Sequence, residues 1–176
     1  MAIKRKPSYS NFRVGKTSLI KRYVQNKYIP AYKPTIGADF LTKEVLVDQQ
    51  VVTLQCWDTA GQEKYHSLTA AFYKGANCCV LVYDITEPGS FKSLNDWKDR
   101  FLANAALKNP DTFPFVLIGN KSDLEDKRKV KKEIAEKWCQ DNLNIPYYEA
   151  SAISGDLNYI FKKVTEVALA NHNGVM

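Results

Sequence analysis

Apolar residues alternate with polar ones in one stretch of this chain and run without interruption in two others. Between residues 52 and 57, Val, Leu and Cys alternate with Thr, Gln and Trp, which predicts a strand with one covered face. The runs at residues 78–83 and 115–118 are continuously apolar, as in central strands that are covered on both faces. Polar residues follow each run, Asp84 after the first and Gly119-Asn120 after the second. The pattern therefore places polar groups at the carboxyl ends of buried strands.

Between and around these strands, apolar residues recur at helical spacing. Strands that alternate with helices predict an α/β domain with a mostly parallel sheet, and such sheets bind ligands beyond the carboxyl ends of their strands. There is no repeat and no linker, so we expect one domain over residues 1–176. The predicted helices are marked by Leu19, Ile20, Tyr23 and Val24, by Phe91, Leu94, Phe101 and Leu102, by Ile134, Ala135 and Trp138, and by Ile160, Phe161, Val164 and Val167.

Composition narrows the class of protein further. A hydrophobic content of 45% and a charged content of 25% are typical of a globular chain, and no apolar run approaches a membrane span. The net charge of +6 is dispersed, so solvated surface is favoured over a nucleic-acid site, an alternative that salt-sensitive DNA or RNA binding would revive. The basic start has no apolar core behind it, which indicates a cytosolic protein. We expect buried, reduced thiols at Cys56, Cys78, Cys79 and Cys139.

Two motifs carry phosphate chemistry. The segment "WDTAGQE" puts Asp58 at the end of a strand and follows it with Gly61 and Gln62, which are the parts needed to hold Mg²⁺, sense a terminal phosphate and orient a water. Earlier in the chain, Gly15-Lys16-Thr17-Ser18 is the back half of a phosphate-binding loop. Its front half is broken, because Ser10 stands where the motif needs a glycine. Taken alone, this fragment also fits an ordinary helix start.

Two further features favour a nucleotide site over an ordinary helix start. Asn120-Lys121-Ser122-Asp123 directly follows an apolar strand and offers a carboxylate to the two donors on one edge of guanine. Adenine lacks that pair of donors, so the motif favours GTP over ATP. Thr35 could complete a Mg²⁺ shell, although an ordinary loop threonine remains the alternative for this position taken by itself.

From Val14 to about Ala170 the chain resembles the Ras superfamily, and within it the Rab GTPases. The segment "TIGADFLTKEV" from Thr35 is most similar to the Rab branch of late endosomes, lysosomes and vacuoles. "AFYKGANCCVLVYDIT", "FPFVLIGNKSDLE" and "NIPYYEASA" support the resemblance. It implies a three-layer P-loop GTPase domain, with a mostly parallel six-stranded sheet and helices on both faces. It also implies a monomeric GTP/GDP switch in vesicle trafficking.

The resemblance implies a role for each site residue. Thr17 and Thr35 would ligate Mg²⁺, with Asp58 supporting it through water. Lys16 and the N–H of Gly61 would contact the terminal phosphate, and Gln62 would position the attacking water. The guanine would be held by Asn120, Lys121 and Asp123, helped by Ser151 and the N–H of Ala152. The remaining GTP-binding residues would be Arg13, Val14, Gly15, Ser18 and Tyr32.

The same resemblance implies partners. Phe40, Trp57 and Phe72 match an aromatic triad through which Rab proteins display their state to effectors, and plain core aromatics are the alternative. Exchange factors, activating proteins and a dissociation inhibitor are implied as well. Rab proteins reach membranes through prenylated cysteines in a C-terminal tail, and residues 171–176 carry none, so we expect no anchor within this sequence.

The chain departs from the family pattern in residues 1–13. Pro7 lacks the N–H that a central strand donates, and Ser10, Phe12 and Arg13 replace small residues of the phosphate loop. A non-glycine residue in a glycine-only conformation costs about 1–3 kcal/mol, or roughly one to two decades of affinity. Either nucleotide binding is altered or this segment reflects a misread exon boundary. Ile153 and Lys64 are milder departures, each from a usual basic residue.

Two functions remain open at this point. The first is a Rab-like GTPase with impaired hydrolysis, because Phe12 stands beside the expected terminal phosphate. Single-turnover hydrolysis by Phe12→Ser tests this hypothesis, and a rate equal to the parent's contradicts it. The second is a pseudo-GTPase that binds partners without a nucleotide cycle.

Overall fold

The computed structural model describes residues 12–28, 35–36, 38–60 and 72–172. Ser10, Tyr32, Gly61 and Gln62 lie outside these residues. The helices are α1 (Lys16–Gln25), α3 (Pro88–Lys92), α4 (Leu94–Asn104), α5 (Lys132–Asp141) and α6 (Leu157–His172), with 3-10 turns at Pro110–Thr112 and Ser122–Lys127. The strands are β1 (Ala38–Val47), β2 (Gln50–Thr59), β3 (Cys79–Asp84), β4 (Phe115–Asn120) and β5 (Tyr147–Ala150).

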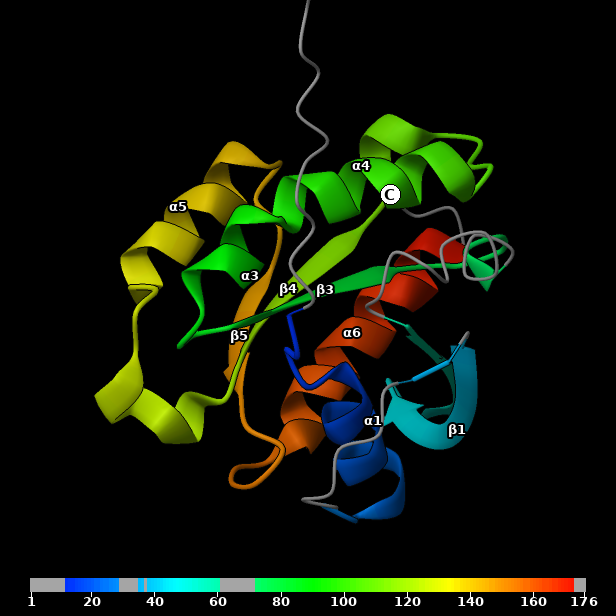
Figure 1. Ribbon diagram of the computed structural model, residues 1–176. Coiled ribbons are helices and arrows are strands. Elements are labelled where there is room, and N and C mark those ends of the chain that lie inside the picture. The colour runs from blue at the N-terminus through cyan, green and yellow to red at the C-terminus, as the bar shows by residue number, and fades with distance from the viewer. Residues whose placement is uncertain (1–11, 29–34, 37, 61–71, 173–176) are drawn as a thin grey trace, which may run out of the picture.

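The described strands form two sheets, one antiparallel and one parallel. β1 and β2 pair as an antiparallel hairpin, while β3, β4 and β5 form a parallel sheet in the order β3-β4-β5 (Figure 1). The segment expected to supply a degenerate first strand lies before Phe12, outside the described residues. The predicted strands around residues 52–57, 78–83 and 115–118 are confirmed.

Two apolar clusters cover the sheets and give the predicted three-layer α/β arrangement. Residues of α4 and α5 pack with β3 and β4 in one cluster, around Tyr83 and Leu117, which are fully buried. Residues of α1 and α6 form the second cluster with Val116 and Ile118 of β4. Side chains of β1, β2 and β3 also pack against this second cluster. One helical layer therefore covers both sheets.

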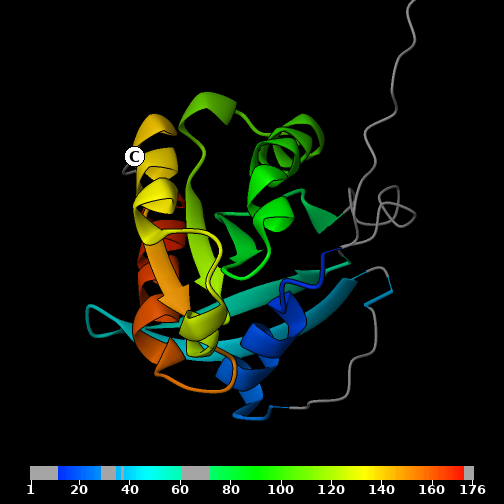
Figure 2. The ribbon, with the colours of Figure 1, turned by 60° about the vertical axis from the view of Figure 1, so that its left-hand side comes forward.

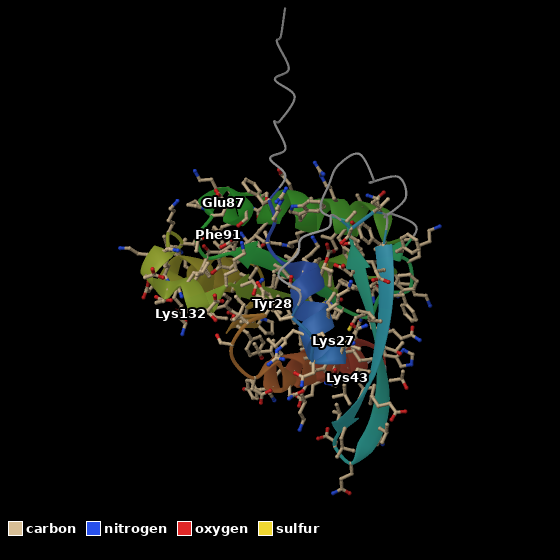
Figure 3. The ribbon with its side chains drawn as sticks, turned by 60° about the horizontal axis from the view of Figure 1, so that its bottom comes forward. Lys27, Tyr28, Lys43, Glu87, Phe91 and Lys132 are labelled. Atoms are coloured by element: carbon tan, nitrogen blue, oxygen red, sulfur yellow. The ribbon has the colours of Figure 1, made fainter. Side chains whose placement is uncertain are left out.

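The hairpin is joined to this layer through Lys43. Its Nζ donates to the carbonyl oxygen of Tyr23 in the last turn of α1 at 2.7 Å and lies 4.0 Å from the centre of the Tyr23 ring. A cation is favourable at a helix C-terminus, where carbonyl oxygens lack intrahelical partners. Tyr23 in turn stacks on Phe161 of α6 at 4.0 Å. The hairpin consequently lies beside α1, as Figure 2 and Figure 3 show.

The four cysteines are free thiols, as predicted. Cys139 is buried, whereas Cys56, Cys78 and Cys79 are only partly buried. Burial raises the pKa of the thiols, to about 11 for Cys56 and to about 12 for Cys78. No helix in the described ranges is long and apolar enough to cross a membrane.

Candidate functional site

The phosphate-loop residues lie where α1 begins, next to the end of β4. Gly15 has φ of 86°, in the left-handed region that favours glycine. A Cβ at this position would lie 2.5 Å from the Asn120 side-chain nitrogen, so space as well as backbone conformation requires glycine here. Asn120 Nδ2 donates to the carbonyl oxygen of Val14 at 2.7 Å. The end of β4 thus holds the loop at the N-terminus of α1, where backbone N–H groups favour an anion.

Three predicted metal-site residues converge beside this loop. The Thr17 hydroxyl donates to Asp58 Oδ2 at 2.6 Å, and the Thr35 hydroxyl lies 2.9 Å from that of Thr17 and 3.3 Å from Asp58 Oδ2. Thr17 comes from α1 and Asp58 from β2, so the cluster joins elements of both parts of the fold. Asp58 is 2% exposed, and its Oδ1 has no hydrogen-bond partner among the described residues.

This cluster suits a small divalent cation. Two hydroxyls and a carboxylate with one oxygen that no described residue contacts through a hydrogen bond are the hard oxygen ligands that Mg²⁺ prefers. Burial raises the pKa of the Asp58 carboxyl, while hydrogen bonding from Thr17 and the charge of Lys16 oppose that shift. Burial lowers the pKa of the Lys16 ammonium, and Asp58 opposes that change. A cation and an anionic phosphate would therefore each find a buried group of opposite charge.

The predicted guanine-binding residues meet at the carboxyl ends of the parallel strands. The Ser151 hydroxyl donates to Asp123 Oδ1 and accepts from the backbone N–H groups of Ile153 and Ser154 at 3.0 and 3.1 Å. Asp123 remains exposed, so its carboxylate is open to donors of a ligand, whereas Ala152 is buried. The structure thus brings Asn120, Lys121, Asp123, Ser151 and Ala152 to one edge of the sheet.

Asp84 supports this edge in a way that sequence reasoning did not assign. Its carboxylate forms an ion pair with Lys121 and accepts from the backbone N–H and hydroxyl of Thr86 at 2.8 and 2.7 Å. Lys121 has a left-handed φ of 67°. The signal for this role was the polar residue that ends the apolar run at β3, directly beside Asn120 in the strand register.

Phe12 takes a position that the sequence did not predict. Its half-buried ring lies against Gly89 in α3, so closely that a Cβ on Gly89 would clash with the ring carbons. Phe12 also lines a cavity of about 90 Å³ with Lys16 and Ala60. A contact between residues this far apart in the chain leaves no mark in local sequence pattern. Phe12 therefore ties the front of the phosphate loop to α3.

The three predicted effector aromatics form a row of rings at one end of the hairpin. Phe40 and Trp57 face each other across β1 and β2 with ring centres 4.7 Å apart, and Trp57 lies 5.1 Å from Phe72. Phe40 is 42% exposed and Trp57 is 46% exposed. Exposed aromatics at strand positions that face away from the core offer surface for a partner.

Comparison with known proteins now identifies the class. A sequence model described as the Ras family matches residues 10–170, and the chain belongs to this family of GTPases. Within it, the chain is 55% identical over 157 residues to "Ras-related protein Rab7" of Drosophila melanogaster, covering 89% of this chain and 75% of the relative. It is 55% identical over 160 residues to "Ypt/Rab-type GTPase ypt7" of Schizosaccharomyces pombe, covering 90% and 78%.

A third relative agrees with these two. "Ras-related protein Rab-7a" of Dictyostelium discoideum is 50% identical over 164 residues, covering 93% of this chain and 81% of the relative. The predicted fold class, the Rab family and its late-endosomal and vacuolar branch are confirmed. Rab GTPases of this family bind guanine nucleotide and act with regulators and effectors.

Proposed function

We propose that this chain is a guanine-nucleotide-dependent switch of the Rab type in late-endosomal and vacuolar trafficking. The observation that carries the proposal is the convergence of Thr17, Thr35 and Asp58 beside Lys16, at the edge where Asn120 and Asp123 also lie. This arrangement offers cation ligands, a buried ammonium and a guanine-reading carboxylate within one site. The names of the Rab7 and Ypt7 relatives support the branch.

Each residue has a defined part in nucleotide binding. The N–H groups at the start of α1 and the Lys16 ammonium would hold the phosphates, and Asp123 would accept from the guanine edge. Mg²⁺, when bound, would neutralise phosphate charge between Thr17, Thr35 and Asp58. Because Thr35 contacts this cluster from a loop, a ligand there would couple nucleotide state to the neighbouring hairpin.

The roles of Gly61, Gln62 and Tyr32 remain part of the proposal by family resemblance. Gln62 would orient the attacking water, and Gly61 would contact the terminal phosphate through its N–H. We propose impaired hydrolysis because Phe12, by family resemblance, stands at a phosphate-loop position where small side chains are usual. The same residue favours the second candidate function, a nucleotide-free interaction module, because its ring packs against Gly89 of α3 and lines one cavity with Lys16.

The proposed partners follow from the family and the exposed aromatics. Effectors would bind the row formed by Phe40, Trp57 and Phe72, and an exchange factor, an activating protein and a dissociation inhibitor would control the cycle. The protein would associate with the cytosolic face of the late endosome, lysosome or vacuole. That association would need a prenylated C-terminal tail. We expect a monomer with no nucleic-acid partner.

The first experiment measures bound nucleotide. Purified protein is denatured by heat, and the released nucleotide is separated by chromatography and quantified per protein. Guanine nucleotide in near-equal amount supports the switch. A folded protein that is empty and stays empty with added GDP and Mg²⁺ would favour the interaction module. An Asp58→Asn variant, compared with the exposed control Asp48→Asn, should lower the Mg²⁺ dependence of GDP affinity because a neutral amide replaces the carboxylate that would face the cation.

A further inference from the structure

One row of residues crosses the three parallel strands just before their carboxyl ends. Tyr83 of β3 lies opposite Gly119 of β4, and Gly119 lies opposite Glu149 of β5. Tyr147, two residues before Glu149, lies on the same face of the sheet because side chains alternate along a strand. The row therefore lies directly next to the edge at which the predicted guanine-binding residues meet.

Hydrogen bonds connect the side chains of this row. The Tyr83 hydroxyl lies 2.8 Å from the Tyr147 hydroxyl, which in turn donates to Glu149 Oε1 at 2.6 Å. A hydroxyl carries one hydrogen, so the hydrogen between the two tyrosines comes from Tyr83. Burial raises the pKa of the Tyr83 phenol to about 12, which keeps this donor protonated at neutral pH. The hydrogen-bonded chain consequently runs from Tyr83 through Tyr147 to the Glu149 carboxylate.

Gly119 provides the space in which the two hydroxyls meet. A Cβ at this position would lie 2.8 Å from the Tyr83 hydroxyl oxygen and 3.1 Å from that of Tyr147. Both distances are shorter than ordinary van der Waals contact. Because β4 lies between β3 and β5 (Figure 1), the bond between the tyrosines passes over Gly119 and joins the two outer strands directly.

The same chain reaches the turn that holds Asp123. Arg128 donates to both carboxylate oxygens of Glu149, at 2.9 and 2.7 Å, and to both of Glu125, at 2.7 and 2.6 Å. Glu125 lies two residues after Asp123 in the 3-10 turn, and Ser151 lies two residues after Glu149. The Ser151 hydroxyl also donates to Asp123. The Asp123 turn and the Ser151 loop are therefore joined twice, once directly and once through Arg128 and Glu149.

We propose that Tyr83 and Tyr147 are positioning residues for guanine recognition, which act by fixing the orientation of the Glu149 carboxylate. That carboxylate then sets the spacing between the Asp123 turn and the Ser151 loop. Hydrogen bonds weaken steeply as their angle departs from linearity, so an acceptor for the guanine edge must be held in place. The inference rests on the proposed function, in which Asp123 accepts from the guanine edge.

The test removes each hydroxyl and keeps each ring, in Tyr83→Phe and Tyr147→Phe. GDP is compared with IDP, which lacks the exocyclic amine that Asp123 would read. Tyr147→Phe interrupts the chain at its centre, so the ratio of GDP affinity to IDP affinity should fall by about two- to tenfold, the size of one net hydrogen bond. Tyr83→Phe should lower the ratio less. The double variant should match Tyr147→Phe, because Tyr83 acts through Tyr147.

A second measurement needs no nucleotide. The N–H groups of Ile153 and Ser154 donate to the Ser151 hydroxyl, so their amide hydrogen exchange reports how well this loop is ordered. We expect exchange at both amides to be about two- to tenfold faster in Tyr147→Phe. The Leu117 amide, which bonds to Pro146 between β4 and β5, should exchange as in the parent.

The matched control is Tyr148→Phe. Tyr148 is the next residue of β5 and packs on the other face of the sheet, against the α1–α6 cluster and Tyr159. This change also removes one tyrosine hydroxyl from β5, and it leaves the chain from Tyr83 to Glu149 intact. We expect the parent's nucleotide ratio and the parent's exchange at Ile153 and Ser154.

Three results would overturn the inference while the proposed function stands. The parent prefers GDP over IDP in each, and Tyr147→Phe keeps that preference, or the losses in the double variant add, or the melting temperature falls without any change in the ratio. The last result would assign the hydroxyls to general stability. A parent that binds no guanine nucleotide would contradict the proposed function and overturn the role in guanine recognition with it. Exchange at Ile153 and Ser154 would then decide whether the tyrosines order the Ser151 loop.

Discussion

The guanine-facing half and the phosphate-facing half of the site are held in place by different kinds of contact. Asn120 ends β4, Asp123 comes shortly after it, and Ser151 directly follows β5, which pairs with β4 in one parallel sheet. Thr17, Thr35 and Asp58 come from a helix start, a loop and a hairpin that does not pair with that sheet among the described residues. Side chains hold the second group together, whereas a backbone ladder positions the first.

This difference separates two properties that a nucleotide site normally combines. Base recognition needs Asp123 and its support, which the sheet supplies. Tight phosphate binding needs the loop before α1, whose described anchor to the sheet is the bond from Asn120 to Val14. The chain could therefore keep its preference for guanine while its affinity for nucleotide depends on how firmly that loop is held.

The largest effect is expected from a substitution in the guanine-facing half, Asp123→Asn. In Asp123→Asn, a neutral amide replaces the carboxylate that would accept from the guanine edge. Loss of a charge-assisted hydrogen bond costs about 1.5–3 kcal/mol, so GDP affinity should fall by roughly 10- to 150-fold. Titration of a fluorescent GDP analogue measures it.

Two comparisons sharpen this prediction. Asp126→Asn, an exposed change in the same 3-10 turn, should keep the parent's affinity. The parent should also prefer GDP over IDP, which lacks the exocyclic amine, and Asp123→Asn should lose most of that preference. Equal losses for both nucleotides in the variant would indicate that Asp123 acts through loop structure and not by reading the base.

The next largest effect is expected from removing the hydrogen bond that joins the two halves of the site, between Asn120 and Val14. Asn120→Ala removes the donor to the Val14 carbonyl and leaves a buried acceptor without its partner. An unsatisfied buried group costs about 1–3 kcal/mol, so the free energy of unfolding should fall by that amount. Denaturant titration measures it, with Asn95→Ala as the control because Asn95 is an exposed asparagine that accepts one bond from Trp138. A loss no greater than the control's would show that the bond does not anchor the loop.

The sequence anticipated the guanine-facing half well because its signals are local. A continuous apolar run followed by Asn120 and Asp123 places those polar residues at a strand end by spacing alone. Apolar alternation likewise predicted the covered face of β2, and its end placed Asp58 correctly. These features depend on residues that are neighbours in the chain.

The remaining features depend on contacts between distant residues. The ring of Phe12 against Gly89 and the carboxylate of Asp84 against Lys121 required the tertiary arrangement. Pairing between strands also escapes local pattern, so the order β3-β4-β5 required the tertiary arrangement. A shared metal site of Thr17, Thr35 and Asp58 was expected from the motifs that contain them and from family resemblance, although their spacing in the sequence does not reveal their contacts.

The smallest expected effect tests how much the ion pair between Arg128 and Glu149 stabilises β5, the strand before Ser151. Arg128 donates to both carboxylate oxygens of Glu149 at 2.9 and 2.7 Å, and Tyr147 donates to Glu149 at 2.6 Å. Because this cluster is only partly buried, Arg128→Ala should lower the free energy of unfolding by about 0.5–1.5 kcal/mol. Lys137→Ala, which breaks an exposed pair with Asp141, is the control and should change it by less.

The pH dependence distinguishes this ion pair from simple loss of packing. Burial opposes ionisation of Glu149, but hydrogen bonds from Arg128 and Tyr147 outweigh it and hold the pKa of that carboxyl below its ordinary value. Such a group stabilises the fold above its unfolded pKa, and the stabilisation is lost as pH falls through the folded pKa. The difference between parent and Arg128→Ala should therefore be full at pH 7 and shrink as Glu149 is protonated in the folded protein. A difference that stays constant through the acid range would assign the effect to the packing of the arginine stem, and the paired carboxylate would then contribute little to the stability of β5, the strand before Ser151.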